Sequence, residues 1–157
     1  MVVLAGLVIR NGKIVTLGGI INGEISVEGG RICQIAISGL PRGDLEIDAK
    51  GRTVIPGVID AHVHFYDKKF SNREDFASGS SAAAAGGVTT AIVMPLDTPF
   101  LSRQSIEAAV SMGHKESVID FALHAGNMDA ESISRVPEIH TLGINSFKAF
   151  TCEPYQM

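Results

Sequence analysis

Apolar and polar positions follow two different patterns along the chain. Up to about Arg52, short apolar stretches of alternating character are separated by glycines and polar residues, as in β-strands joined by turns. The strands predicted there cover residues 2–9, 13–17, 24–28 and 31–37. Gly29 and Gly30 separate the last two strands, and both can adopt the positive φ angles of a two-residue hairpin turn. The first part is therefore predicted to be a small β-module.

From Thr53 onward, apolar runs alternate with longer stretches of helical periodicity. The runs predicted to be strands cover residues 54–60, 88–94, 118–124 and 145–150. This alternation is typical of parallel βαβα folds. Four such strands make half of an eight-stranded barrel, which typically needs about 250 residues. The sequence ends directly after the fourth strand, so we expect a fragment of a longer protein or a second chain that supplies the missing half.

The helices between these strands have recognisable ends. Asn72 is the predicted N-cap of a helix over residues 73–85, and Ser102 is the predicted N-cap of the next helix. The apolar stripe of that second helix has the spacing of a buried face and consists of Ile106, Ala109, Val110 and Gly113. A third helix is expected to start near Asp129 and to be interrupted by Pro137.

Composition and charge narrow the class of partner. Of the 157 residues, 45% are hydrophobic and 19% are charged, as in ordinary soluble globular proteins. The net charge of -4 without a basic run argues against nucleic acid or an anionic membrane as partner, and favours a small molecule. No apolar stretch approaches the roughly 20 residues of a membrane span, and the first residues do not resemble a signal peptide. The two cysteines, Cys33 and Cys152, form no CxxC pair, so a reducing, cytoplasmic location is predicted.

Two histidines mark a candidate metal site. His62 and His64 are two positions apart in the apolar run VIPGVIDAHVHF, so on an extended strand both imidazoles point to the same side. They also follow a predicted strand at its carboxyl end, where barrel enzymes place their active sites. Asp60 shares this face and is a candidate hydrogen-bond acceptor for a ligand imidazole or a nearby group. The alternatives are a chance pair of histidines in an exposed turn, and a strand-end cap for Asp60.

Lys148 is the second part of this constellation. It alternates with Phe147 and Ala149 in NSFKAF, which is predicted to be a short buried strand. Burial favours the neutral amine, which is nucleophilic and can add carbon dioxide to become a carbamate. A carbamate has two oxygens and can bridge two divalent cations that the histidines partly hold. The alternative is a lysine whose ammonium group extends along the strand end to reach solvent.

Three segments resemble the amidohydrolase superfamily, in particular its cyclic amidohydrolases, which include dihydroorotases, allantoinases and hydantoinases. These segments are DAKGRTVIPGVIDAHVHF, DFASGSSAAAAGGVTTAIVMPLDTP and GINSFKAF. The resemblance implies a metal-dependent α/β barrel of the TIM type, in which residues 53–157 form strands 1 to 4 and the barrel is incomplete. It also implies that residues 1–52 belong to a small β-sandwich that is completed by strands from elsewhere.

The same resemblance implies the ligands and the reaction. His62 and His64 would bind the first of two divalent metal ions, usually zinc, and carboxylated Lys148 would bridge the two ions. A hydroxide shared by the metals would attack the ring carbonyl of a small cyclic amide or ureide. The family places two further histidines and an aspartate general base on later strands, so they are absent from this chain. We therefore expect the isolated chain to be inactive, and to belong to a homo-oligomer or to lack its C-terminal half.

Two positions bear on the substrate, for which dihydroorotase and allantoinase types both remain candidates. Dihydroorotases typically carry an arginine two residues after the histidine pair, where this chain has Tyr66. After the second barrel strand, Leu96 is closer to the allantoinase motif, whereas Asp97 replaces an expected asparagine. Tyr66 and Asp97 are thus candidate substrate-binding residues, and Asp97 is equally suited to a turn before Pro99.

A second class of function is a non-catalytic relative that uses the same scaffold for assembly, because a fold does not guarantee activity. The presence of both site histidines together with Lys148 favours the hydrolase, since a scaffold has no use for a buried lysine. His114, His124 and His140 are interpreted as structural or surface residues.

Overall fold

The computed structural model describes residues 5–66, 72–94, 96 and 99–150. The chain forms two compact units, Met1–Pro56 and Gly57–Met157. No helix in the described part of the chain is long and apolar enough to cross a membrane.

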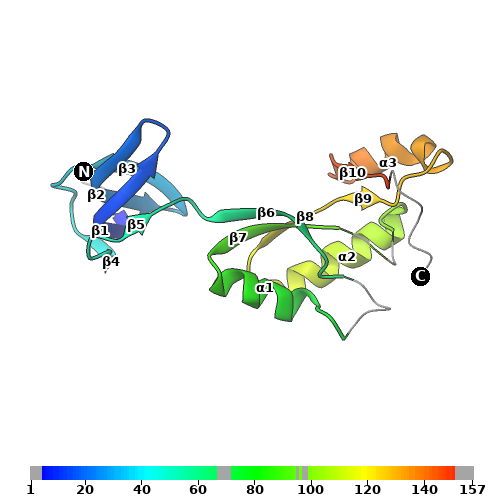
Figure 1. The fold of residues 1–157 in the computed structure, drawn as a ribbon, viewed down its shortest axis with the longest axis horizontal. Helices are drawn as coiled ribbons and strands as arrows, with labels where there is room; N and C mark the ends of the chain where they lie inside the picture. The colour runs from blue at the N-terminus through cyan, green and yellow to red at the C-terminus, as the bar shows by residue number, and fades with distance from the viewer. Residues whose placement is uncertain (1–4, 67–71, 95, 97–98, 151–157) are drawn as a thin grey trace. The chain divides into compact units, whose positions relative to one another are not determined.

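The first unit is built on one sheet with the strand order β3, β2, β1, β4, and a short fifth strand also pairs with β1 (Figure 1). The strands are β1 (Ala5–Thr16), β2 (Gly19–Glu28), β3 (Arg31–Ala36), β4 (Gly43–Asp48) and β5 (Thr53–Val54). The β1–β2 and β2–β3 pairs are antiparallel, whereas β4 and β5 run parallel to β1.

Several elements of this unit differ from the sequence prediction. β1 is one strand where two are predicted, because its register shifts between Ile9 and Gly12 without ending the pairing. β4 is missed by the sequence pattern, since three of its six residues are charged. The hairpin turn is confirmed, because Gly29 and Gly30 have φ angles of 55° and 75°.

The boundary between the units lies later than the sequence predicts. Thr53 and Val54 pair with Lys13 and Ile14 of β1, so they belong to the first unit. The strand predicted over residues 54–60 is therefore wrong in its start, because Pro56 lies between β5 and the next strand.

One face of the first sheet is lined by aliphatic side chains. Residues directly opposite each other in neighbouring strands point to the same face, so partners form rows across the sheet. The two rows consist of Leu45, Leu7, Val27 and Ile32, and of Ile47, Ile9, Ile25 and Ile35. Leu45 and Ile32, at the ends of the first row, are 58% and 64% exposed. This aliphatic face is thus partly open to solvent in the structure.

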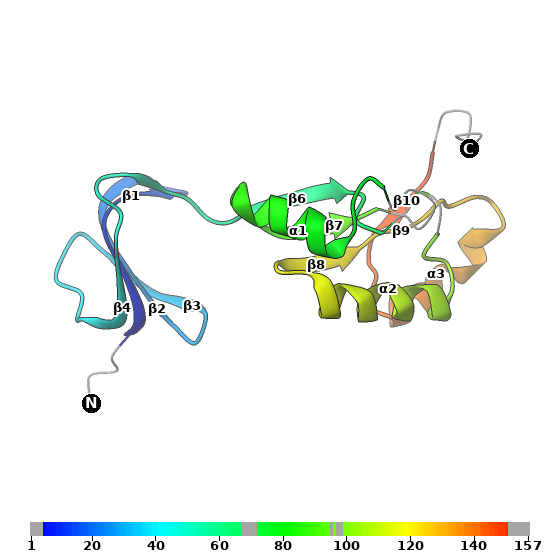
Figure 2. The same ribbon diagram turned by 90° about the horizontal axis from the view of Figure 1, so that it is seen from below.

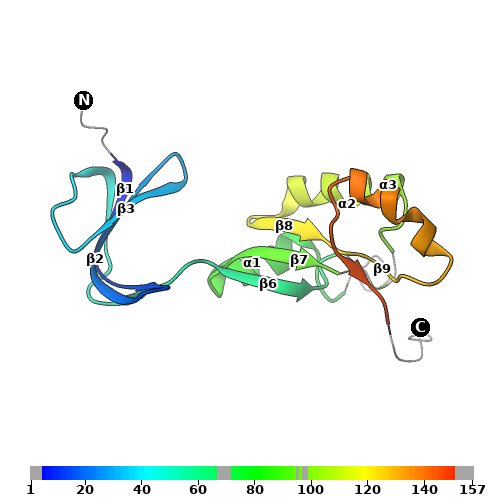
Figure 3. The same cartoon turned by 90° about the horizontal axis from the view of Figure 1, so that it is seen from above.

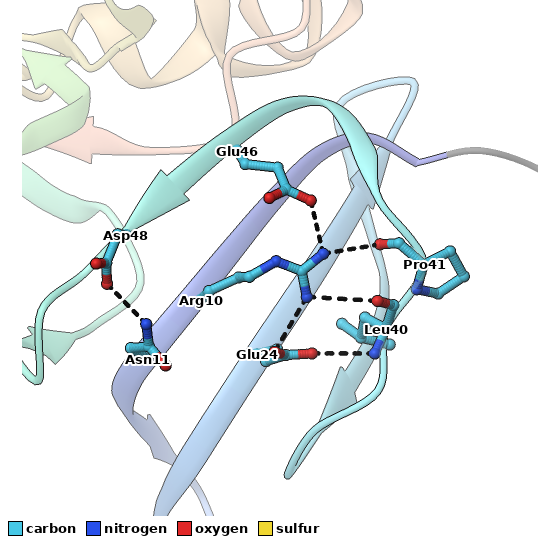
Figure 4. Close-up of polar contacts among 7 residues, drawn as sticks. All are labelled: Arg10, Asn11, Glu24, Leu40, Pro41, Glu46 and Asp48. Atoms are coloured by element: carbon cyan, nitrogen blue, oxygen red, sulfur yellow. Dashed lines mark hydrogen bonds and ion pairs between the residues drawn. The ribbon is translucent and has the colours of Figure 1, made fainter.

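The opposite face carries a charged cluster around Arg10 (Figure 4). The guanidinium group lies 3.0 Å from Glu24 and 2.6 Å from Glu46. It also donates to the carbonyl oxygens of Leu40 and Pro41. Glu24 in turn accepts a hydrogen bond from the backbone N–H of Leu40. The cluster therefore ties the segment before β4 to strands β1, β2 and β4.

We expect acid to loosen this cluster. The N–H of Leu40, and then Arg10, lower the pKa of Glu24 from its usual 4.5, and the hydrogen bond from Arg10 lowers that of Glu46. The stabilisation is therefore complete above the usual glutamate pKa and is lost as the pH falls through the lowered values. NMR titration should show both midpoints below 4.5, and Arg10→Gln should raise the Glu46 midpoint. Arg31→Gln is the control, and an unmoved Glu46 midpoint in Arg10→Gln would contradict the prediction.

The second unit contains a parallel sheet with the order β6, β7, β8. Its strands are β6 (Val58–Val63), β7 (Val88–Val93) and β8 (Asp120–Leu123). A separate parallel pair consists of β9 (Ala125–Gly126) and β10 (Phe147–Lys148). Helices α1 (Phe76–Ala85) and α2 (Arg103–Glu116) connect the sheet strands and lie on one side of the sheet (Figures 1 and 2). The alternation of strands and helices is as predicted, and the described strands do not close into a barrel.

The helix starts follow from local hydrogen bonds. Ser102 caps α2 as predicted, since its side chain accepts from the N–H of Ser105. The start of α1 is later than predicted, because Asp75 accepts from the N–H of Ser78 at 2.8 Å and so takes the capping role assigned to Asn72.

The third helical segment is also shaped by its sequence. A 3₁₀ turn at Ser132–Arg135 leads into α3 (Val136–Thr141). Pro137 lies in the first turn of α3, where no intrahelical N–H donor is needed. The prediction that Pro137 interrupts a helix is therefore wrong, since this residue helps to start one.

The helices and the sheet of the second unit share one apolar core. Phe76, Phe100 and Ile106 are buried in it together with Ala91 and Val93 of β7. The predicted stripe of α2 is confirmed, because Ile106, Ala109 and Gly113 are buried and Val110 packs against the same core. This packing fixes the strands, and with them their carboxyl ends.

Gly113 of α2 lies so close to the ring of Phe121 that a Cβ atom would overlap it. Alanine favours a helix over glycine by about 1 kcal/mol, but overpacking a core costs about 1 to 3 kcal/mol. Phe121 is itself held between Phe76 and His114. We therefore expect Gly113→Ala to lower the free energy of unfolding, as measured in urea. Ser111→Ala, at an exposed position of α2, is the control, and a more stable Gly113→Ala would contradict the prediction.

Candidate metal-binding site

The two predicted histidines lie at the carboxyl edge of the parallel sheet. His62 belongs to β6, and His64 comes directly after its last residue, Val63. Because parallel strands end at the same edge, the segment after β8 reaches this edge as well. There β9 pairs with β10, which contains Lys148 (Figure 3). The fold therefore brings the carboxyl ends of these strands, together with the residues at those ends, to the same edge of the sheet.

The two imidazoles point at one another. Their Nε2 atoms are 3.3 Å apart and the ring planes meet at 75°. Two ligands on one tetrahedral zinc ion, each about 2.0 to 2.1 Å from it, are separated by about 3.3 Å. The geometry of His62 and His64 thus fits two ligands of a single ion.

The protonation of His64 is fixed by a neighbouring strand. Its Nδ1 lies 3.0 Å from the carbonyl oxygen of Met94, which follows β7. Because a carbonyl oxygen only accepts, Nδ1 carries the hydrogen, and in the neutral ring Nε2 is the acceptor nitrogen. Without a metal ion, the Nε2–H of His62 can donate to this Nε2.

The surroundings of His62 lower its pKa and so favour the neutral imidazole. Desolvation of the ring is the largest cause of a lowered pKa, followed by Coulombic repulsion from His64, Lys148 and His124 in their protonated forms. Asp60 acts weakly in the opposite direction. A neutral imidazole is the form that binds a metal ion.

The pairing of β6 with β7 is irregular between Asp60 and Val63. Asp60 pairs with Ala91, and Val63 pairs with Val93, so β6 has one residue more than β7 in this interval. The carboxylate of Asp60 accepts a hydrogen bond from the backbone N–H of His62 at 3.0 Å. The sequence predicted that Asp60 bonds to an imidazole or a nearby group, and the described contact is to the main chain of His62.

His124 is a residue whose contact the sequence pattern did not indicate. Its Nε2 lies 3.2 Å from the carbonyl oxygen of Ala61, in the irregular segment of β6. Its Nδ1 is buried and has no hydrogen-bond partner among the described residues. The only available signal was its position directly after β8, at the edge where the site lies.

Lys148 is less buried than the sequence predicts. Lys148 is half-buried and lies in the two-residue strand β10, opposite Gly126. The ammonium Nζ lies 4.8 Å from the ring centroid of Phe150, within the range of a cation–π contact. Its charge nevertheless reaches His62, whose pKa it helps to lower.

The two predicted substrate residues fare differently. The ring of Tyr66 is buried and packs against Phe76 and Phe100, with ring centroids 5.9 and 5.6 Å apart. The structure thus gives this ring a packing role, and a substrate contact stays a prediction. Asp97 lies outside the described residues.

The donor set fits a divalent transition metal in part. Imidazole nitrogens suit zinc and its neighbours, and a catalytic zinc takes three protein ligands. Within the ranges that the structure describes, no group of three or more His, Cys, Asp or Glu side chains is placed to hold a metal ion. His62 and His64 are therefore candidates for two ligands, and a carboxylated Lys148 is a candidate for an added oxygen ligand.

Comparisons with a family model, with curated proteins and with solved structures all point to the same family. The model of the amidohydrolase family matches residues 53–142. A dihydroorotase of Methanothermobacter thermautotrophicus is 42% identical over 81% of the chain, and an allantoinase of Solibacter usitatus is 38% identical over 91%. An L-hydantoinase (dihydropyrimidinase) from Arthrobacter aurescens has a similar structure, with a TM-score of 0.82 and 30% identity over 92% of the chain. The chain spans 29% and 31% of the first two relatives and 32% of the third, or about a third of their length.

Proposed function

Because this chain belongs to the amidohydrolase family, we propose that it carries part of a metal-dependent hydrolase that opens a cyclic amide or ureide. The observation that carries the proposal is the 3.3 Å separation of the two Nε2 atoms, which fits two ligands of one ion. The names of the relatives, which include dihydroorotase, allantoinase and hydantoinase, support a small cyclic substrate. The proposal covers the dihydroorotase and allantoinase types, which share this ring-opening chemistry.

In the proposed site, His62 and His64 bind a divalent ion, with zinc as the first candidate. The carbonyl of Met94 orients the ring of His64, and Asp60 holds the main chain of His62, so little rearrangement is needed for binding. Bound divalent cations supply an acidified water and polarise the scissile carbonyl.

Lys148 takes part in this proposal as a carbamate. Its deprotonated Nζ adds to the carbon of carbon dioxide, so that a nitrogen–carbon bond forms while one oxygen of carbon dioxide becomes anionic. One proton of the nitrogen leaves to solvent. The resulting anion would offer its oxygens to bound divalent cations, in place of the contact that the ammonium form makes with Phe150.

The fold of the complete protein is part of the same proposal. We assign β6, β7, β8 and β10 to the first four strands of a (β/α)8 barrel, and the first unit to a β-sandwich that other strands complete. The aliphatic face of the first unit supports a missing second layer, since Leu45 and Ile32 are more than half exposed. The remaining metal ligands and an aspartate general base then come from later strands or from another chain, for example in a homo-oligomer.

The proposal is tested on the complete polypeptide by elemental analysis and by assays with dihydroorotate, allantoin and hydantoin. We expect about two metal ions per site, as in two-metal hydrolases, and ring opening of at least one of the three substrates. Absence of metal after reconstitution with zinc and bicarbonate, together with absence of ring opening, would contradict the proposal. That result would favour a non-catalytic scaffold.

A further inference from the structure

His124 reaches a strand that is not its neighbour in the sheet. It follows β8, whereas β7 lies between β8 and β6 in the strand order. Its backbone N–H donates to the carbonyl of Val93 in β7, as a continuation of the parallel ladder. Its side chain then extends to β6, where Nε2 lies 3.2 Å from the carbonyl oxygen of Ala61.

The carbonyl of Ala61 and the N–H of His62 belong to one peptide unit. Asp60 accepts from that N–H at 3.0 Å, and His124 contacts the carbonyl at the other end of the same unit. Both contacts therefore act on a single rigid plane, because a peptide unit has no internal soft torsion. The orientation of this plane determines the direction in which the side chain of His62 leaves the strand.

This peptide unit needs support from side chains. It lies where β6 has one residue more than β7, between the Asp60–Ala91 and Val63–Val93 pairs. At such a bulge the ladder of backbone hydrogen bonds is locally disrupted, and the direction of the side chains changes. The contacts of Asp60 and His124 replace the ladder at the position that aims His62.

The hydrogen-bond roles in this contact are determined by its chemistry. A carbonyl oxygen only accepts, so the Nε2 of His124 carries the hydrogen and Nδ1 of the neutral ring is an acceptor. That Nδ1 is buried without a partner among the described residues, which is unfavourable for folding. An apolar side chain of similar size would avoid this cost, so stability alone does not favour a histidine here.

We propose that His124 is a positioning residue for the metal site, which together with Asp60 clamps the Ala61–His62 peptide and so aims the imidazole of His62. The inference rests on the proposed function of His62 and His64 as metal ligands. His124 itself touches neither the metal nor the substrate in this proposal.

The test compares three variants of the complete polypeptide. His124→Leu removes the donor at similar volume, His124→Gln keeps an N–H donor at a similar distance from the backbone, and His140→Leu changes an exposed histidine on α3 as the control. Zinc affinity is measured by competition with a chromogenic chelator, and the geometry of the site by the visible spectrum of the cobalt(II) form. We expect His124→Leu to lower zinc affinity by about 10-fold to 100-fold and to change the cobalt spectrum. His124→Gln should restore most of the affinity, and His140→Leu should match the unmodified protein.

A second measurement on the metal-free protein separates this inference from the function on which it rests. Long-range proton–nitrogen NMR should show His124 with its hydrogen on Nε2, and His124→Leu should speed exchange of the His62 amide hydrogen by at least about tenfold. Normal zinc affinity in His124→Leu, or equal losses in His124→Leu and His124→Gln, would overturn the positioning role while leaving the proposed function intact. If the unmodified protein binds no zinc, the proposed function fails, and the positioning role as stated fails with it. The exchange rate of the His62 amide hydrogen then shows whether His124 restrains the Ala61–His62 peptide unit in the absence of a metal.

Discussion

Replacing His62 or His64 by alanine should abolish metal retention and lower kcat/KM for ring opening by at least about a thousandfold, or about 4 kcal/mol of barrier. Each imidazole is half of a pair whose Nε2 atoms are 3.3 Å apart, so the loss of one leaves a single ligand of this pair. Elemental analysis of the complete polypeptide measures metal retention, and a continuous assay with the preferred cyclic substrate measures activity.

The folded state should tolerate the His62 substitution. His62 is exposed, so His62→Ala should change the free energy of unfolding of the metal-free protein by no more than about 0.5 kcal/mol. His140→Ala, at an exposed position near the end of α3, is the control and should keep metal and activity. If His62→Ala retained its metal ions and its rate, this pair would not be the metal site.

Replacing Lys148 by alanine should have the next largest effect, a loss of metal and at least about a hundredfold loss of activity. The reason is the proposed bridging carbamate, which alanine cannot form. Native mass spectrometry of the complete protein should show an excess equal to one carbon dioxide, and Lys148→Ala should lack it. Added acetate or propionate should partly restore Lys148→Ala, because a small carboxylate can offer two oxygens in the space that the side chain leaves.

Lys115 provides a matched control for this experiment. It is exposed in the last turn of α2, so Lys115→Ala should keep the carbon dioxide, the metal and the rate. A full complement of metal in Lys148→Ala without any added carboxylate would rule out the bridging role. Metal retention that is unaffected by removal of carbon dioxide and bicarbonate from the refolding buffer would count against the carbamate itself.

Local chemistry explains why part of this structure was predictable. The Gly29–Gly30 turn and the Ser102 cap depend on residues within four positions of each other, so their signals are contained in short stretches of sequence. The pairing of His62 with His64 is local in the same way, since a spacing of two on an extended strand brings both rings to one side.

The features that were missed depend on distant parts of the chain. The register irregularity of β6 exists only relative to β7, about 30 positions later, and the contact of His124 with Ala61 joins residues 63 positions apart. Val54 pairs with the distant Ile14 of β1, and Pro56 separates it from β6. The place of Tyr66 after the histidine pair predicts a substrate contact, whereas its ring packs against the distant rings of Phe76 and Phe100.

The aliphatic face of the first unit affects how such a protein can be made in a cell. This unit is translated before the second unit, and in the proposed sandwich any covering strands that follow the second unit in the complete polypeptide are translated later still. Pairing between segments so far apart in the chain is slow, because the entropy of loop closure is lost before the contacts form. Meanwhile β3 and β4 are edge strands of a sheet whose Leu45 and Ile32 stay exposed, a combination that invites pairing with other nascent chains. The yield of the complete protein should therefore depend on chaperones that shield this face during translation.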